Sequence, residues 1–239
     1  MTLQTRHLDY HEGDATLRAT VAWDDSIAVQ QPGVLVAHAW RGRSEFEDKK
    51  ALALASLGYV GFALDVYGRG QLGTNPTENA KLMQPFMDDR ALLQRRLQAA
   101  LAALRAVPEV DDQRVAGIGF CFGGLCMLDL ARSGADLAGV VSFHGLLSKP
   151  ATPAAADIRA RILLLHGWDD PMATPDEVLA LSRELSSAGA DWQLHAYGKT
   201  LHAFTNPLAN DPANGLQYRP RAERRAWCSM QNFLAEIFE

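Results

Sequence analysis

This sequence of 239 residues has few cysteines, no excess of positive charge and no long apolar run, and each absence excludes a class of protein. Three cysteines cannot form a disulfide framework, so we expect reduced thiols. The 23 basic and 28 acidic residues give a net charge of −5, which argues against nucleic-acid binding, because phosphate affinity requires clustered Lys and Arg. Apolar runs such as 162–165 are far shorter than the roughly 20 residues that span a bilayer.

Signatures of metal and nucleotide cofactors are also missing. There is no His-Glu-x-x-His and no Cys-x-x-Cys, since four residues separate Cys121 from Cys126. Gly117 and Gly119 alone do not make up the glycine-rich motif of a dinucleotide-binding site. The first residues show no basic stretch followed by an apolar core, so we expect no signal peptide. These absences predict a cytoplasmic protein that uses no cofactor and binds neither membrane nor nucleic acid.

What the sequence does contain is an alternation of short apolar runs with longer helical stretches. Runs typical of buried strands lie at 33–38, 59–65, 114–120, 138–143, 161–166 and 191–197, and helical spacing occurs at 47–57, 91–107, 122–132, 175–188 and 219–238. This order predicts parallel strands with crossover helices on both faces of a sheet. Residues 15–23 alternate like an antiparallel edge strand, and 69–87 has the composition of a loop. No linker is visible, so we expect one α/β domain over 1–239.

One cysteine stands where a strand is expected to run into a helix, within Gly119-Phe120-Cys121-Phe122-Gly123-Gly124. This is the layout of a nucleophile elbow, with Cys where Ser is commoner. Glycines on both sides let strand and helix close tightly, and the helix N-terminus favours a thiolate. We predict Cys121 as the nucleophile and the N–H of Phe122 as an oxyanion donor. The alternative is a buried apolar cysteine in a glycine-rich turn.

A nucleophile elbow predicts an acid and then a histidine, each in a loop after a later strand. The strand 161–166 leads into a glycine turn with Asp169 and Asp170, and we favour Asp170 as the acid. The last strand leads into the loop 198–204, which holds His202. His202 would accept the thiol proton, and Asp170 would orient its ring. The alternatives are an aspartate that caps the next helix and an ordinary loop histidine.

Other aromatic and imidazole side chains neighbour these loops. The loop after the first central strand should supply the second oxyanion donor, and within it we select the N–H of Trp40. Trp168 and Phe204 are candidate pocket walls, because they neighbour the expected acid and base. For His38 and His144, which end or follow strands, we favour a structural, hydrogen-bonded role.

Together, these segments resemble the dienelactone hydrolase family of the α/β-hydrolase fold over nearly the whole chain. The resemblance rests on 64–68, the elbow at 119–124, 142–145, 166–171, 202–207 and the terminal helix at 218–238. It implies a single-domain α/β-hydrolase fold that hydrolyses carboxylic esters or lactones through an acyl-thioester. The implied triad is Cys121, Asp170 and His202, with oxyanion N–H groups from Phe122 and Trp40.

The sequence departs from the family pattern where a substrate carboxylate would bind. A Glu that activates the cysteine in that pattern is replaced by Ala39, and an Arg after the histidine is replaced by Asn206. A second Arg and a Tyr fall at Pro76 and Ala80. The dienelactone itself is therefore a doubtful substrate, while ester or lactone hydrolysis is little affected.

The lost cations have three candidate replacements, and the lost Glu has a mechanistic consequence. Arg41, Arg43 or Arg69 could bind a carboxylate, although each is more often a solvated surface charge. Without the Glu, we predict that Cys121 and His202 are paired at rest.

The competing function on the same fold is a redox-sensitive thiol or a ligand-binding protein without turnover. The substrate and the oligomeric state, monomer or weak dimer, stay open at this point.

Overall fold

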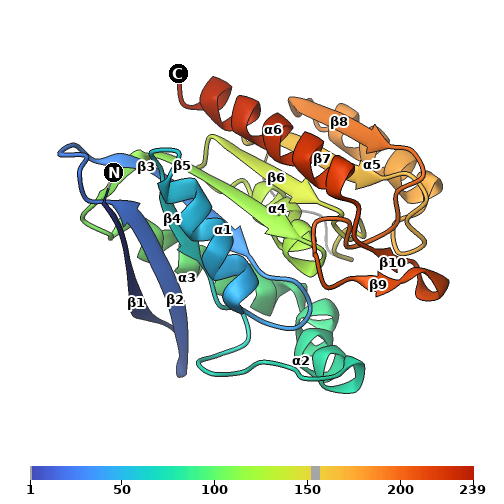
Figure 1. Ribbon diagram of the computed structural model, residues 1–239, viewed down its shortest axis with the longest axis horizontal. Helices are drawn as coiled ribbons and strands as arrows, with labels where there is room; N and C mark the ends of the chain where they lie inside the picture. Colours follow the sequence, from blue (N-terminus) through green and yellow to red (C-terminus); the bar gives the residue numbers. More distant parts are fainter. Residues whose placement is uncertain (1, 152–156) are drawn as a thin grey trace. The chain divides into compact units, whose positions relative to one another are not determined.

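The computed structural model describes residues 2–151 and 157–239 (Figure 1). Two compact units make up the chain, Met1–Ile118 (unit 1) and Gly119–Glu239 (unit 2). The elements in chain order are β1 Leu3–Glu12, β2 Ala15–Asp24, β3 Gln31–Ala37, α1 Glu45–Ala55, β4 Val60–Ala63, α2 Pro76–Asp88, α3 Arg90–Arg105, β5 Val110–Phe120, α4 Phe122–Arg132, β6 Gly139–Phe143, β7 Arg161–Gly167, α5 Pro175–Ser187, β8 Trp192–Tyr197, β9 Asn210–Asp211, the 3-10 helix η1 Pro212–Asn214, β10 Leu216–Gln217 and α6 Pro220–Ile237.

The fold class is α/β, as the alternation of strands and helices predicts. Eight strands form a mostly parallel sheet: β1-β2-β4-β3 is the order within unit 1, β6-β7-β8 is the order within unit 2, and the eighth strand, β5, contains the boundary between the units in the sequence. The pairs β3–β4, β6–β7 and β7–β8 are parallel. The pairs β1–β2 and β2–β4 are antiparallel, which confirms the expected antiparallel strand at 15–23. That chain 1–239 is one domain stays a prediction.

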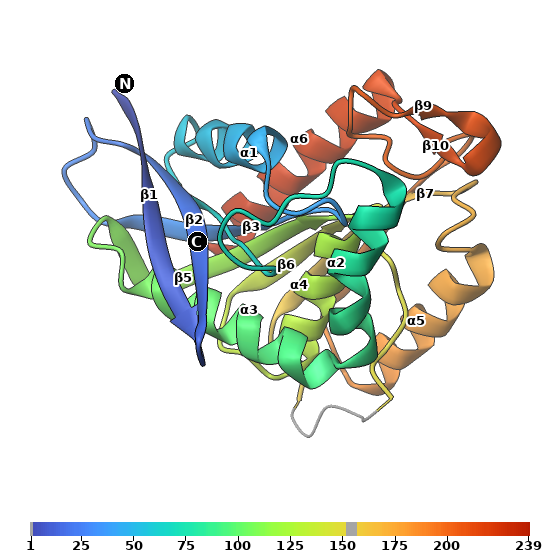
Figure 2. The same cartoon turned by 90° about the horizontal axis from the view of Figure 1, so that it is seen from below.

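Helices α1 and α3 cover opposite faces of the sheet in unit 1 (Figure 2). A Cβ added to Gly33 would lie 3.1 Å from Leu104 of α3, whereas one added to Gly61 would overlap Ala51 of α1. Gly61 pairs with Val34, the neighbour of Gly33. Because successive residues of a strand point to opposite faces, the two helices lie on opposite sides.

In unit 2, helices α4 and α6 cover opposite faces in the same way. A Cβ on Gly124 of α4 would lie 2.5 Å from Oγ of Ser142, and a Cβ on Gly139 would lie 3.0 Å from Phe233 of α6. Gly139 and Ser142 are three positions apart on β6, so they face opposite sides. Within the described ranges, no helix has both the length and the apolar character that a membrane crossing requires.

Two segments differ from the sequence-based expectation. The segment 69–87, expected to be a loop, contains all but the last residue of α2. The two prolines and two asparagines of the segment give it a loop-like composition, but Asn75 accepts a hydrogen bond from the N–H of Glu78 (3.0 Å) and Pro76 occupies the first turn. Both are helix-start signals that the sequence offered. The strand β1, which sequence patterning did not identify, pairs with β2 over its whole length.

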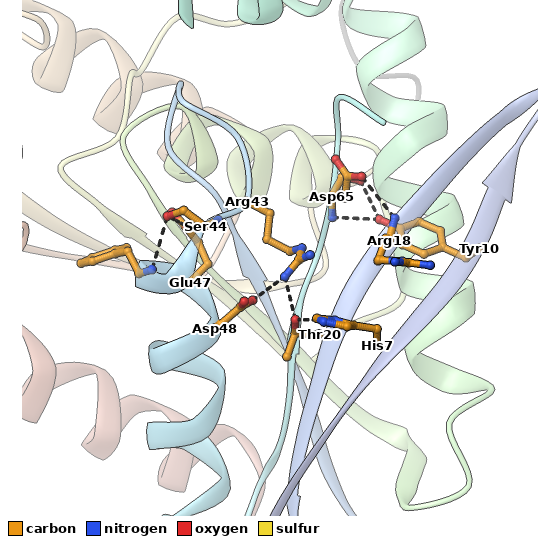
Figure 3. A network of polar contacts seen from close by, with 10 residues as sticks. His7, Tyr10, Arg18, Thr20, Arg43, Ser44, Glu47, Asp48 and Asp65 are labelled. Carbon is orange, nitrogen blue, oxygen red and sulfur yellow. Dashed lines mark hydrogen bonds and ion pairs between the residues drawn. The ribbon is translucent and has the colours of Figure 1, made fainter. Parts of the chain in front are cut away.

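Buried polar contacts hold the loop after β3 in unit 1 (Figure 3). The carboxylate of Glu47 accepts hydrogen bonds from the N–H (2.9 Å) and hydroxyl (2.8 Å) of Ser44 and from the N–H of Ala39 (3.3 Å). Burial raises the pKa of Glu47, and nearby His38 opposes this. The N–H of Val66 donates to Nε2 of His38 (3.2 Å), and Nδ1 of His38 lies 2.7 Å from the carbonyl of Ala39. His38 is therefore a structural, hydrogen-bonded histidine.

The three arginines considered as substrate cations each have a partner within unit 1. Arg43 pairs with Asp48 at 2.7 Å and Arg69 with Asp9 at 3.3 Å. Nε of Arg41 donates to the carbonyl of Gly73 at 3.0 Å. The charges of Arg43 and Arg69 are thus partly neutralised by carboxylates, and Arg41 is hydrogen-bonded to the backbone of a neighbouring loop.

Candidate active site

Cys121 lies in the sharp turn between β5 and α4. Its φ of 56° is unusual for a non-glycine residue, and its N–H donates to the carbonyl of Phe143 at 3.0 Å. A Cβ on Gly119 would overlap the carbonyl of Gly123, so this strand and helix approach as closely as their glycines allow. The local geometry is that of a strained elbow that presents a side chain at the start of a helix.

Several residues near this turn have a strained backbone. Among the described residues, the non-glycine positions with positive φ are Cys121 (56°), His144 (38°), Lys199 (55°) and Ala203 (57°). Ala203 directly follows His202, so three of these four positions belong to the candidate site or touch it. Strained backbone of this kind persists where the surrounding structure enforces it, and it is concentrated at functional sites.

Phe122 is the first residue of α4 and is fully buried. The first N–H groups of a helix point out of its N-terminus, where the helix dipole favours negative charge. The position of Phe122 directly after Cys121 therefore suits an oxyanion donor.

Asp170 and His202 are in direct contact. Nδ1 of His202 lies 2.7 Å from Oδ2 of Asp170, and both residues are buried, with 1% and 2% of their surface exposed. Oδ1 of the same carboxylate accepts the N–H of Met172 at 2.8 Å. The neighbouring Asp169 is exposed, and its N–H donates to the carbonyl of Thr200 (3.1 Å). The turn thus directs the second of the two aspartates toward the imidazole.

Charges around His202 favour its protonated form. Burial by itself would lower the pKa of His202, but the charge of Cys121 and the hydrogen bond and charge of Asp170 outweigh burial and raise that pKa to about 10. The pKa of His166, a buried neighbour on β7, is lowered by burial, although Asp170 opposes this. The two imidazoles are therefore expected in different charge states at neutral pH.

A second segment holds the backbone of His202 in place. Its N–H donates to the carbonyl of Gly215 at 2.9 Å, and its carbonyl accepts the N–H of Gln217 at 3.1 Å. His202 and Leu216 form an isolated parallel bridge. The candidate base is thus held through both its backbone N–H and its carbonyl, although it lies in a loop.

His144 packs directly against the candidate base. Its ring meets that of His202 edge-on at 5.1 Å, and Nε2 lies 2.8 Å from the hydroxyl of Thr205. The same ring contacts Phe204 edge-on at 5.1 Å. His144 is therefore a structural, hydrogen-bonded histidine, as expected, but one that borders the candidate site.

The predicted pocket residues of unit 2 lie in different settings. Trp168 is 43% exposed, as a wall of an open site would be, whereas Phe204 is fully buried against Tyr197 and His144. Asn206 is half-buried, and its Oδ1 accepts the N–H of Leu208 at 3.0 Å. Phe204 thus has the setting of a packing residue, and the roles of all three in substrate binding stay predictions.

Three further predicted site residues belong to unit 1. Ala39 and Trp40 are half-buried in the loop after β3, and Arg69 is exposed after β4. The hydroxyl of Tyr67 donates to the carbonyl of Trp40 at 2.9 Å, and the carbonyl of Ala39, in the peptide that carries the N–H of Trp40, accepts the N–H of Gly42 at 3.1 Å. The assignments of Trp40 as oxyanion donor and of Ala39 and Arg69 as pocket residues stay predictions.

Several residues that shape the site were not identified from sequence, namely His166, Thr205 and Gly215. Thr205 follows the histidine loop and His166 ends a strand, so their positions were visible, but their partners were not. Over the described parts of the chain, no three His, Cys, Asp or Glu side chains gather as metal ligands would.

Comparison with known proteins relates this chain to known hydrolases. The model of the dienelactone hydrolase family matches residues 17–238. Among curated relatives named for an activity, a putative carboxymethylenebutenolidase from Aquifex aeolicus is 30% identical, covering 84% of this chain and 87% of that protein. A probable 2-oxo-3-(5-oxofuran-2-ylidene)propanoate lactonase from Bradyrhizobium is 28% identical, covering 82% and 80%. A solved dienelactone hydrolase-like promiscuous phosphotriesterase from metagenomic libraries is 37% identical with a TM-score of 0.96, covering 100% of both chains.

Proposed function

This chain belongs to the dienelactone hydrolase family, whose members are hydrolases of ester and lactone bonds, and we propose that it uses Cys121, His202 and Asp170 as a catalytic triad. The observation that carries the proposal is the buried 2.7 Å contact between His202 and Asp170, in the same unit as a strained cysteine at a helix start. The charge of Cys121 raises the pKa of His202, which supports a resting thiolate–imidazolium pair.

In the proposed reaction, the thiolate of Cys121 attacks the substrate carbonyl carbon and forms a tetrahedral oxyanion. The imidazolium of His202 then protonates the departing alkoxide, which leaves as an alcohol, and an acyl-thioester remains. His202, now neutral, takes a proton from water as that water attacks the thioester. The carboxylic acid leaves and the thiolate–imidazolium pair returns, while Asp170 holds the ring throughout.

The oxyanion is stabilised in this proposal by N–H groups of Phe122 and Trp40. Phe122 is supported by its place as the first residue of α4, where a helix dipole favours negative charge. For Trp40, support comes from the Ala39–Trp40 peptide in the loop after β3, whose carbonyl accepts the N–H of Gly42 at 3.1 Å.

We propose a neutral ester or lactone as substrate. Asn206 stands where the family pattern has a cation, and its neutral amide carries no positive charge to compensate a carboxylate. Arg43 and Arg69, two of the candidate replacements, are paired with carboxylates. The negative charge of an anionic substrate would therefore be compensated less well than by a guanidinium that binds a carboxylate with two hydrogen bonds. Because the nucleophile must be a reduced thiol, we place the protein in the reducing cytoplasm.

The test is release of p-nitrophenol from p-nitrophenyl acetate, with a panel of neutral and carboxylate-bearing lactones read as kcat/KM. Cys121→Ala and His202→Ala should each abolish turnover, and the neutral lactones should be preferred. Equal turnover by the wild type and Cys121→Ala would overturn the mechanism. That result would favour the alternative function, a redox-sensitive thiol or a ligand-binding protein on this fold.

A second candidate activity is phosphotriester hydrolysis, favoured by the similarity over the whole chain to the promiscuous phosphotriesterase. The same thiolate would attack phosphorus in place of a carbonyl carbon and break the bond from phosphorus to the leaving oxygen, so that p-nitrophenolate leaves. Water, deprotonated by His202, would then cleave the S–P bond, releasing the phosphodiester and the thiolate. Diethyl p-nitrophenyl phosphate tests this, with Cys121→Ala as the control. Absence of p-nitrophenol release above that control would exclude it.

A further inference from the structure

Gly215 holds the backbone of the candidate base. It ends η1 with a φ of +79°, its N–H donates to the carbonyl of Pro212 (3.1 Å), and its carbonyl accepts the N–H of His202 (2.9 Å). The residue is buried although it lies in a mostly exposed hairpin. The carbonyl of Gly215 therefore sets the position of the backbone N–H of His202.

The opposite side of Gly215 contacts the turn that carries the candidate acid. A Cβ on Gly215 would overlap Cγ of Pro171 and lie 2.7 Å from its Cδ. Pro171 directly follows Asp170. Because a proline ring is covalently closed onto its own backbone, it cannot rotate away from an added methyl group, and the turn itself would have to move.

The acid turn also touches the loop before His202, at a second glycine. A Cβ on Gly167, at the start of the acid turn, would lie 2.6 Å from the carbonyl oxygen of Thr200 and 2.8 Å from that of Leu201. The N–H of Asp169 donates to the carbonyl of Thr200 at 3.1 Å. The acid turn is thus packed directly on the backbone that precedes His202 and on the residue that binds its N–H.

We infer that Gly215 is a positioning residue that sets the distance between Asp170 and His202. Its carbonyl fixes the base, and its bare Cα gives the acid turn room to approach. The inference rests on the proposed function, since it concerns the acid and base of that triad. It assigns a role in catalysis to a glycine that touches no reacting atom.

Gly189 offers a matched control. It has a similar φ of +67° and a similar turn hydrogen bond, from its N–H to the carbonyl of Ser186 (3.1 Å), but an added Cβ would meet nothing within 4 Å. Gly189→Ala therefore introduces the backbone strain of an alanine with positive φ without a steric conflict. Gly189→Ala thus measures the effect of that strain on stability, and removal of the Pro171 ring in the Gly215→Ala background isolates the contact with Pro171.

The test compares Gly215→Ala, Gly189→Ala and the double variant Gly215→Ala with Pro171→Ala. Gly215→Ala should lower kcat for p-nitrophenyl acetate by about 10- to 100-fold with little change in KM, because a small displacement of catalytic groups has effects of that size. The pKa of His202, followed by NMR of its ring nitrogens, should fall as the carboxylate moves away. Removal of the Pro171 ring should restore both quantities.

The inference is wrong if Gly215→Ala lowers only the Tm, as Gly189→Ala should, and leaves kcat and the His202 pKa unchanged. It is also wrong if Pro171→Ala gives no rescue. Should Gly215→Ala not fold, the double variant must fold with the wild-type His202 pKa, and its failure would equally overturn the inference. The NMR readout needs no turnover, so it tests Gly215 even if the proposed hydrolysis is not observed.

Discussion

Nδ1 of His202 lies 2.7 Å from Oδ2 of Asp170, 32 positions away in the sequence, and both side chains are almost fully buried. A buried charge that loses its partner is costly, since no water replaces the lost contact. The pair therefore couples the charge state of the imidazole to the presence of the carboxylate.

Asp170→Asn should separate the roles of the two adjacent aspartates. The variant loses the negative charge beside Nδ1, so the pKa of His202 should fall, and kcat for p-nitrophenyl acetate should drop by about 10³- to 10⁴-fold. NMR titration of the ring nitrogens and steady-state kinetics measure the two effects. The control is Asp169→Asn, because that side chain is exposed, and it should leave both values near the wild type. Equal losses in the two variants would contradict the assignment.

The resting state of Cys121 can be read from its alkylation. Because the His202 imidazolium stabilises a neighbouring thiolate, iodoacetamide should label Cys121 faster than Cys228, which is exposed on α6, at pH 6 to 7. Mass spectrometry of the two peptides gives the ratio of rates within one sample. His202→Ala should remove the advantage. A rate that becomes high only when a substrate analogue is bound would show that the pair is not formed at rest.

His144 should affect turnover through Thr205 and the ring of His202. His144→Leu removes the 2.8 Å hydrogen bond and leaves a buried hydroxyl without that contact, so kcat should fall between about 10- and 100-fold at nearly constant KM. His144→Gln keeps a polar group near Thr205 and should recover much of the rate. The pair Thr205→Ser and Thr205→Val repeats the comparison from the other side. If all four variants share one rate, the hydrogen bond has no positioning role.

Gly119→Ala tests the closeness of strand and helix at the elbow. The added methyl group would overlap the carbonyl of Gly123, so the turn should open, and both kcat and the alkylation rate of Cys121 should fall. Gly198→Ala is the matched change, since an added Cβ there meets nothing within 4 Å and its φ is not positive. It should behave like the wild type. Retention of full activity by Gly119→Ala would mean that the elbow tolerates a wider geometry.

A buried arginine should contribute to stability away from the site. Arg132, 3% exposed at the end of α4, pairs with Asp129 at 3.2 Å and with Glu184 of α5 at 2.8 Å. Arg132→Met leaves Asp129 buried without its cation and should lower the free energy of unfolding by about 3–5 kcal/mol, measured by urea denaturation. Arg114→Met removes an exposed ion pair and should change it little. A small loss in both variants would show that water reaches Asp129.

Local patterns in the sequence predicted much of the framework. Three features could be recognised directly because they depend only on neighbouring residues or on chain order. They are the strand periodicity, the glycines around Cys121 and the order of cysteine, aspartate and histidine. The helix α2 was missed although its capping signals were present, because prolines made its composition resemble that of a loop.

The sequence by itself determined the α/β order of the elements, the candidate nucleophile and the loops that hold its partners. Only the tertiary structure decided which of two adjacent aspartates faces the imidazole, since both satisfy the same pattern and only the turn directs one inward. It also decided that His144 borders His202 and that Gly215 lies against Pro171. These contacts join segments far apart in the chain, and their fit depends on packing, which no local pattern encodes.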